Sequence, residues 1–305
     1  MAFFALGENF NGFFGKINPG ASFVAQASSE HTTVTGLIED RNGLAAELSP
    51  SCFLQGSYRQ DTAIYAINDV DIVVVCRLWY PPSDGGSARG YGRDEIFRII
   101  AAPLLNDRRY SSKVRFGPTS MCIKVDLGIK LEILPVVFKA GNYDPSLEPF
   151  VLYRPSSQKW EDGYARQHQR WLTYKNQNSG FIPSIKVLKH LRSRARLDAV
   201  SFHLECLLFN LSDAVFKNGP ADYIPAFLRA IANVSAAGWY MKRVLTPCGE
   251  RDIFSTQEWR MESWGRFHAA VVGWSRLADI AAATPDRNRA IAAWKALLGD
   301  DYFPW

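Results

Sequence analysis

The fold of this chain is decided by the stretch GSYRQDTAIYAINDVDIVVV, which occupies residues 56–75. Gly56 and Ser57 come after a short β-rich run and precede residues that are compatible with a helix. Backbone N–H groups at a helix start, together with the Ser57 hydroxyl, are suited to binding a phosphate, and glycine lets the phosphate come close. A GS dipeptide alone is usually a turn, so its meaning depends on the residues after it.

Two aspartates, Asp69 and Asp71, then open a strongly apolar run. Because side chains alternate between the faces of a strand, carboxylates two residues apart point to the same face. Such a face suits Mg²⁺, which prefers oxygen ligands and completes its shell with water and substrate phosphates. By itself the pair would more often be solvated acids at a strand start. After a strand, a GS turn and a helix, it predicts a nucleotidyl-transfer site.

A third carboxylate is expected on an adjacent strand. Glu132 stands in the apolar run IKLEILPVV, where an unpaired charge would cost several kcal/mol, and metal ligation would offset that cost. Asp126, in the preceding run, is the alternative. We expect Asp69, Asp71 and Glu132 to be catalytic and to hold two Mg²⁺ ions, with Mn²⁺ able to substitute. Two ions would activate a hydroxyl and steady a leaving pyrophosphate.

The order of patterns predicts an α+β fold, with a mixed-sheet nucleotidyltransferase lobe followed by an all-helical lobe. The expected domains are residues 1–163, an N-terminal helix and the core, and residues 164–305, the helical lobe. A polar stretch at 140–163 separates the strand-rich part from the helical part, and residues 81–92 and 141–163 are expected to be mobile. Strands are predicted at 52–55, 71–80, 121–127 and 129–138, and helices at 8–48 with a break at 18–20, 93–106, 181–194, 199–216, 224–236, 257–283 and 288–298.

Composition sets broad limits on function. The 305 residues are 47% hydrophobic and 21% charged, enough for a substantial core. The five cysteines are scattered and favour neither a zinc site nor a disulfide framework. No apolar run is long enough to span a bilayer, so we expect a cytoplasmic protein without a membrane partner. The net charge of +5 fits a phosphate-bearing partner but does not require one.

Several motifs together resemble one known family. GSYRQDTAI with DVDIVVV is shared by all polymerase-beta-type transferases, whereas LEILPVV, SIKVLKHLR, SFHLECLLF and the closing GDDYFPW narrow the choice. Over nearly the whole chain the sequence resembles the bacterial cGAS/DncV-like nucleotidyltransferases (CD-NTases, SMODS-type) of CBASS anti-phage systems. That resemblance implies a polymerase-beta-like lobe, a helical lobe and an active-site cleft between them.

The resemblance also implies substrates and further site residues. Ribonucleoside triphosphates would be joined into a cyclic di- or trinucleotide second messenger, and Lys189 and Ser201 would contact the triphosphate, beside Gly56 and Ser57. A simpler interpretation makes Ser201 an N-cap and places Lys189 on a solvated basic helix face. That face would consist of Lys186, Lys189, Arg192, Arg194 and Arg196.

Other acceptors and roles stay open at this point. The nucleotide could be transferred to an RNA 3′ end, a protein or a small molecule, or the chain could be a non-catalytic nucleotide or RNA sensor. No long basic track is evident, so no stable nucleic-acid partner is expected. His203 and Glu205 are expected to serve packing and orientation. A regulatory protein or ligand is not specified by the sequence.

Overall fold

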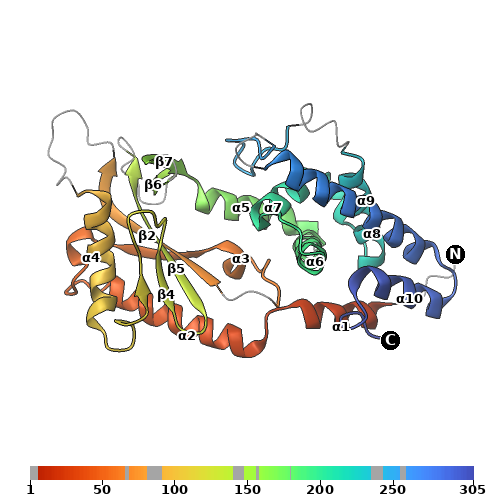
Figure 1. Ribbon diagram of the computed structural model, residues 1–305, viewed down its shortest axis with the longest axis horizontal. Coiled ribbons are helices and arrows are strands. Elements are labelled where there is room, and N and C mark those ends of the chain that lie inside the picture. Colours follow the sequence, from red (N-terminus) through yellow and green to blue (C-terminus); the bar gives the residue numbers. More distant parts are fainter. Residues whose placement is uncertain are drawn as a thin grey trace. The chain divides into compact units, whose positions relative to one another are not determined.

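The computed structural model shown in Figure 1 describes residues 6–65, 69–80, 91–139, 148–155, 158–178, 180–234, 243–254 and 259–305. The chain divides into two compact units. The sheet unit consists of Pro19–Asp61 and Ala66–Gln169, and the helical unit consists of Met1–Asn18, Thr62–Tyr65 and Arg170–Trp305. The sequence placed a single boundary after residue 163. The structure instead groups the first residues, and a short piece of the GSYRQDTAI segment, with the helical unit.

A mixed sheet forms the centre of the sheet unit. The order of its path is β1-β2-β5-β4-β3, and β6 pairs with β5 and β7. Strands β2 and β5 run parallel, whereas the other pairs are antiparallel. The strands are β1 (Ser51–Gln55), β2 (Asp69–Tyr80), β3 (Val114–Arg115), β4 (Ile123–Asp126), β5 (Lys130–Lys139), β6 (Phe150–Arg154) and β7 (Lys159–Gly163).

The two faces of strand β2 have different surroundings. Val70, Ile72 and Val74 belong to a buried cluster that also contains residues of helices α2 (Ala21–Ile38) and α4 (Arg93–Asn106). Figure 1 shows both helices beside the sheet. Val73 and Val75 alternate with them and belong to a smaller apolar cluster on the opposite face. Because residues two apart share a face, this second face carries Asp69 and Asp71 at the start of the strand.

The helical unit is built on one large apolar cluster. In it, the Phe10 ring of α1 packs edge-on against Trp294 at 5.0 Å and against Phe303 at 5.1 Å between ring centroids. These contacts explain why the N-terminal helix groups with the C-terminal one. The helices are α1 (Gly7–Ile17), α6 (Phe181–Arg194), α7 (Ser201–Phe209), α8 (Pro220–Ala232), α9 (Met261–Ala283) and α10 (Arg287–Leu298), with 3₁₀ turns at Asn176–Asn178 and Asp213–Phe216.

Most predicted elements are present, with differences after residue 139. The stretch expected to connect the lobes contains the hairpin β6–β7, and helix α5 (Ala165–Lys175) follows it. Little in the sequence indicated α5, because Leu172 is its one buried residue among those described. The helix expected at 199–216 ends at Phe209. Residues 81–90 and 141–147, which belong to the segments expected to be mobile, lie outside the described residues. Elsewhere, η1 (Ala46–Leu48) and α3 (Gly56–Arg59) flank β1.

The remaining composition-based expectations concern membranes and cysteines. Among the described helices, none combines the length and the apolar character that crossing a bilayer requires. All five cysteines are free thiols, as their scattered spacing predicted. Burial raises the pKa of the Cys122 thiol to about 11, so this cysteine is uncharged at neutral pH.

Candidate active site

Gly56 lies at the junction between β1 and the single helical turn α3. Its φ of +73° lies in the left-handed region, which glycine adopts without a steric penalty. A Cβ atom at this position would lie 1.9 Å from Oδ2 of Asp71. The close approach at Gly56 is therefore to the Asp71 carboxylate, whereas the sequence analysis expected a phosphate there. Ser57 follows within the same turn, and α3 is much shorter than the helix the sequence suggested.

Strand pairing places charged residues in rows across the sheet. In one row, Asp71 of β2 is paired with Gln55 of β1 on one side and with Glu132 of β5 on the other. Lys124 of β4 continues this row beyond Glu132. Neighbouring strands lie about 4.8 Å apart, so Asp71 and Glu132 are adjacent on the same face. The structure thus brings Glu132 beside the aspartates, as the sequence predicted.

Asp126, the alternative third carboxylate, lies in a different row. It is paired with Lys130, which is itself paired with Asp69. Asp126 is therefore separated from β2 by a whole strand, with a lysine between it and Asp69. Glu132 is the carboxylate that strand register places next to Asp71.

A pocket of about 400 Å³ opens over this face of the sheet. Asp71 and Glu132 both line it, and Val73 and Leu134, on the same face, form its apolar part. Asp69 is not among the lining residues. The other lining residues are Gln55, Ile72, Thr119, Ser120, Met121, Cys122 and Lys124. The pocket thus combines an acidic edge, an apolar floor and a lysine.

Glu132 differs in one respect from its predicted environment. The sequence suggested a carboxylate buried in an apolar strand, for which metal ligation would be the compensation. In the structure its side chain is 31% exposed and its Oε1 lies 2.9 Å from Nζ of Lys124. The alternation of β5 points Glu132 at the pocket rather than at the core, and Lys124 already supplies an opposite charge. Burial therefore gives no argument for a metal at Glu132.

The fit of a divalent cation depends on the oxygen atoms near Asp71. Within the described residues, no three His, Cys, Asp or Glu side chains converge as a complete metal site. However, Oε1 of Gln55, the pairing partner of Asp71, is buried with no hydrogen-bond donor among the described residues. Two carboxylates and an unused amide oxygen are hard ligands of the kind that Mg²⁺ prefers. The residues present therefore fit such an ion at Asp69 and Asp71.

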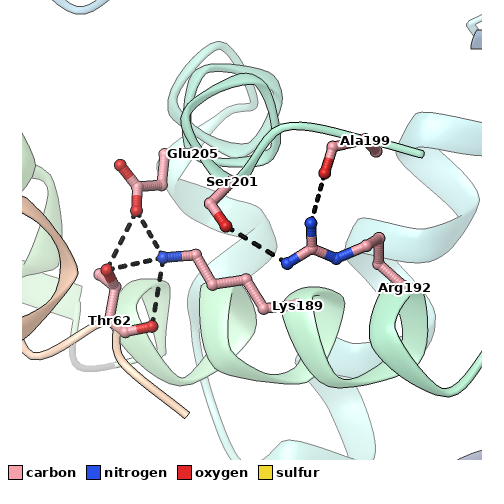
Figure 2. A network of polar contacts seen from close by, with 6 residues as sticks. All are labelled: Thr62, Lys189, Arg192, Ala199, Ser201 and Glu205. Atoms are coloured by element: carbon pink, nitrogen blue, oxygen red, sulfur yellow. Dashed lines mark hydrogen bonds and ion pairs between the residues drawn. The ribbon is translucent and has the colours of Figure 1, made fainter. Parts of the chain in front are cut away.

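Figure 2 shows where the structure places Lys189, the predicted triphosphate contact. Its side chain is only 3% exposed, and its Nζ lies 2.7 Å from Oε1 of Glu205, which is 7% exposed. Nζ also donates to Oγ1 of Thr62 at 2.9 Å and to the Thr62 carbonyl oxygen at 3.2 Å. All of these residues belong to the helical unit. The ammonium group is fully used inside the protein, and Glu205 is its charged partner.

Ser201 is the first residue of α7, and Val200 is the N-cap. The interpretation of Ser201 as the N-cap is therefore wrong by one position, and no side chain caps this helix. Ser201 Oγ accepts a hydrogen bond from Nη2 of Arg192 at 3.3 Å. The basic face of α6 is not uniformly solvated either. Lys186 and Lys189 are buried, whereas Arg194 and Arg196 are exposed.

Sequence reasoning missed Gln55 and three further residues that bear on these sites. Identifying Lys124 as the partner of Glu132 would have required knowledge of the β4–β5 register. The only sequence signal was the presence of opposite charges in two neighbouring strands, which can form cross-strand pairs. Thr62 stood in the quoted GSYRQDTAI motif, but nothing local indicated that it would be bonded by a lysine far along the chain. Arg192 was grouped with the solvated helix face, and no sequence signal separated it from Arg194.

Comparisons with known proteins agree with this architecture. No protein-family model matches the chain. A cyclic UMP-AMP synthase of Rhodothermus marinus (strain SG0.5JP17-172) is 25% identical over 240 residues, which cover 72% of this chain and 82% of that protein. Among solved structures, the R. marinus CdnE c-UMP-AMP synthase has a TM-score of 0.65 at 20% identity, covering 88% of this chain and 96% of the other.

Two further structures match almost end to end. The E. coli MS115-1 CdnC has a TM-score of 0.72 at 14% identity and covers 97% of this chain and 98% of its own. The Vibrio cholerae cyclic AMP-GMP synthase DncV has a TM-score of 0.70 at 11% identity, covering 96% of each chain. The fold is therefore that of the polymerase-beta-like nucleotidyltransferases with a helical lobe. Within that class, the chain is similar to the cGAS/DncV-like nucleotidyltransferases.

Proposed function

We propose that this enzyme is a Mg²⁺-dependent synthase that joins ribonucleoside triphosphates into a cyclic di- or trinucleotide second messenger for anti-phage defence. The observation that carries the proposal is the row Gln55, Asp71 and Glu132 across β1, β2 and β5, with Asp69 on the same face. The similarity to a cyclic UMP-AMP synthase supports the class of product.

The reaction joins two nucleotides through phosphorus. A ribose hydroxyl of one nucleotide forms a bond to the α-phosphorus of another, the bond from that phosphorus to the bridging oxygen of the β-phosphate breaks, and pyrophosphate leaves. The hydroxyl proton is released. A further transfer closes the ring. Such in-line displacement depends mainly on positioning and on neutralising negative charge.

Each site residue has a role in this scheme. Asp69 and Asp71 would hold Mg²⁺, which lowers the pKa of a bound hydroxyl and neutralises charge on the phosphates. Glu132, adjacent to Asp71, would assist the attacking hydroxyl once its carboxylate is released from Lys124. Gly56 leaves room for Asp71, and the Ser57 hydroxyl beside it would donate to a phosphate oxygen.

The two residues of the helical unit that were predicted to contact the triphosphate, Ser201 and Lys189, differ in how readily they could bind a phosphate. Ser201 carries a hydroxyl at the start of α7 and fits the role. Lys189 would have to leave its ion pair with Glu205 to reach a phosphate, and the Glu205 carboxylate would then be buried with its positive partner lost. Breaking a buried ion pair costs about 3–5 kcal/mol. We therefore propose Ser201 as a phosphate contact, and Lys189 as one only after its release from Glu205.

The proposal is tested by incubating purified protein with Mg²⁺ or Mn²⁺ and labelled NTPs, singly and mixed. A phosphatase-resistant, nuclease-sensitive di- or trinucleotide, identified by mass spectrometry, is the expected product. The double variant Asp69→Asn, Asp71→Asn should give none while keeping the wild-type circular dichroism spectrum. Product from that double variant would overturn the assignment of the two aspartates. Labelling of an added RNA, protein or small molecule instead of a ring would show transfer to another acceptor.

A further inference from the structure

One wall of the pocket is formed by the connection between two strands. Residues 119–122 line the pocket together with Asp71 and Glu132, and they lie between β3 and β4. The pairing of β3 with β4 stops at Arg115 and Lys124, so the hydrogen bonds between these strands do not reach the wall. The position of the wall therefore depends on other contacts.

Two hydrogen bonds close a turn at residues 117–120. The backbone N–H of Gly117 donates to Oγ of Ser120 at 2.9 Å, and the N–H of Ser120 donates to the Gly117 carbonyl oxygen at 2.9 Å. Both bonds join residues of the turn to each other. They define its shape, but they do not fix it to the rest of the sheet unit.

Arg93, the first residue of α4, provides that connection. Its Nη2 donates to the carbonyl oxygen of Gly117 at 2.8 Å and to that of Ser120, so it bonds both ends of the turn. The guanidinium is itself held by α4, because Nη1 donates to Oδ1 of Asp94 at 2.6 Å and the central carbon lies 3.8 Å from the centre of the Phe97 ring. The Arg93 side chain is only 8% exposed, and hydrogen bonds from a charged donor are the stronger kind. The turn is thus clamped to α4.

The clamped wall presents two side chains that suit a nucleoside. Met121 is 40% exposed and Thr119 is also exposed, and both line the pocket. A thioether packs well against aromatic rings, and a hydroxyl can donate a hydrogen bond to a base or ribose or accept one from it. Glu132 of the same pocket is the carboxylate proposed to assist the attacking hydroxyl. A nucleoside held by this wall would therefore belong to the nucleotide whose hydroxyl attacks.

We propose that Arg93 is a positioning residue for nucleotide selection, which holds Thr119 and Met121 in place against the nucleoside of the attacking nucleotide. Arg93 is not among the lining residues, so it acts through the turn and not on the substrate. The inference rests on the proposed function, because it needs a nucleotide in the pocket. It adds to that function the residues that set which nucleoside is accepted.

The competing explanation is that Arg93 only stabilises the turn and the start of α4. A purely structural arginine would lower the free energy of unfolding without changing how the enzyme ranks nucleotides. A positioning arginine would also raise the KM of the selected nucleotide and leave kcat nearly unchanged. The reason is that contacts to a nucleoside remote from the reacting atoms are equally strong in the ground state and the transition state.

The first test measures kcat and KM of the full-length protein for each NTP, with the other NTPs held at saturation. Arg93→Met should raise the KM of at least one NTP by about 10-fold, below the roughly 100-fold that a 1 Å misplacement can cost. Arg93→Lys should fall between, because an ammonium lacks the planar fork of a guanidinium, and it replaces the methionine variant if that variant does not fold. Arg115→Met is the matched control and should select nucleotides like the wild type. Arg115 also donates to two backbone carbonyl oxygens, those of Ser112 and Val114, at residues that do not line the pocket.

A double-mutant cycle tests whether Arg93 acts through the wall. Once Thr119→Ala and Met121→Ala have removed the contacts to the nucleoside, Arg93→Met should have little further effect on KM, whereas independent effects would add. Additive losses, or an unchanged KM in Arg93→Met, would overturn the positioning role while leaving nucleotide synthesis intact.

A second measurement does not depend on catalysis. Amide hydrogen exchange of residues 116–122 in the ligand-free protein should be faster in Arg93→Met than in Arg115→Met or the wild type. Unchanged exchange would refute the clamp, even in an enzyme that makes its product. A wild type that makes no nucleotide product would instead remove the proposed function and the selection role with it, whereas faster exchange in Arg93→Met would still demonstrate the clamp.

Discussion

The Cα of Gly56 lies so close to Asp71 that an added Cβ would be 1.9 Å from Oδ2 and 2.8 Å from Cγ of that carboxylate. The GS motif and the paired aspartates, which look like separate signals in the sequence, are therefore in direct contact. Glycine is required at this position for two reasons: its φ is +73°, and the Asp71 carboxylate occupies the space that a Cβ atom would need.

Gly56→Ala should abolish most activity, because the methyl group must displace the Asp71 carboxylate. The left-handed conformation alone costs an alanine about 1–2 kcal/mol. Gly128→Ala is the control, since Gly128 has a φ of +88° but only a distant side-chain nitrogen of Gln26 near its Cβ position. Steady-state product formation and denaturant unfolding separate the effects. Equal activity losses in the two variants would mean that backbone strain, not Asp71, is the cause.

Lys124→Met should lower the Mg²⁺ concentration needed for half-maximal activity. Lys124 competes with a cation for Glu132, and their hydrogen bond raises the pKa of the lysine. Lys139→Met is the matched control, because Lys139 pairs with Asp162 on the same sheet at residues that do not line the pocket. The measurement is a Mg²⁺ titration of product formation. An unchanged or higher requirement would show that Lys124 does not oppose the metal.

Lys189→Met should destabilise the protein by about 3–5 kcal/mol, because Glu205 would be left buried without its partner. The control is Arg229→Met, which removes an ion pair with Asp279 whose side chains are 59% and 40% exposed. Exposed pairs contribute about 0–1 kcal/mol. Urea unfolding measures both variants. Similar decreases in unfolding free energy for the two variants would contradict the burial of the Lys189–Glu205 pair.

His190 should make stability depend on pH below neutrality. Burial lowers its pKa from 6.5 to about 4, while Nε2 donates to the Leu298 carbonyl oxygen. The folded state thus binds fewer protons than the unfolded state between these values. The resulting stability is complete above pH 6.5 and is lost as the pH falls toward 4, by an amount on the order of 3 kcal/mol. When the unfolding midpoint is plotted against pH over this range, the slope should be steeper for the wild type than for His190→Phe. Parallel curves would refute the assignment.

Local features were well predicted from the sequence. The apolar run after Asp69 predicted a strand with both aspartates on one face, and α4 and α6 begin and end where their periodicity predicted. Pairing across the chain was harder. The sequence predicted that Asp71 and Glu132 lie on adjacent strands, but it did not predict that they are direct pairing partners, because a helix and two strands separate them along the chain. The Lys124–Glu132 and Lys189–Glu205 pairs depend on tertiary placement, which no window of sequence contains. The polar helix α5 offered almost no apolar pattern.

The membership of α1 in the helical unit sets an order for assembly during synthesis. Phe10 and Phe13 are made long before their partners Trp294 and Phe303. Synthesis proceeds at about 5–20 residues per second, so the sheet unit can fold while the apolar face of α1 still lacks its packing partners. The hydrogen bonds from Lys189 to Thr62 likewise form only after α6 has been synthesised. A nascent chain therefore carries the acidic face of β2 before most of the helical unit has been made.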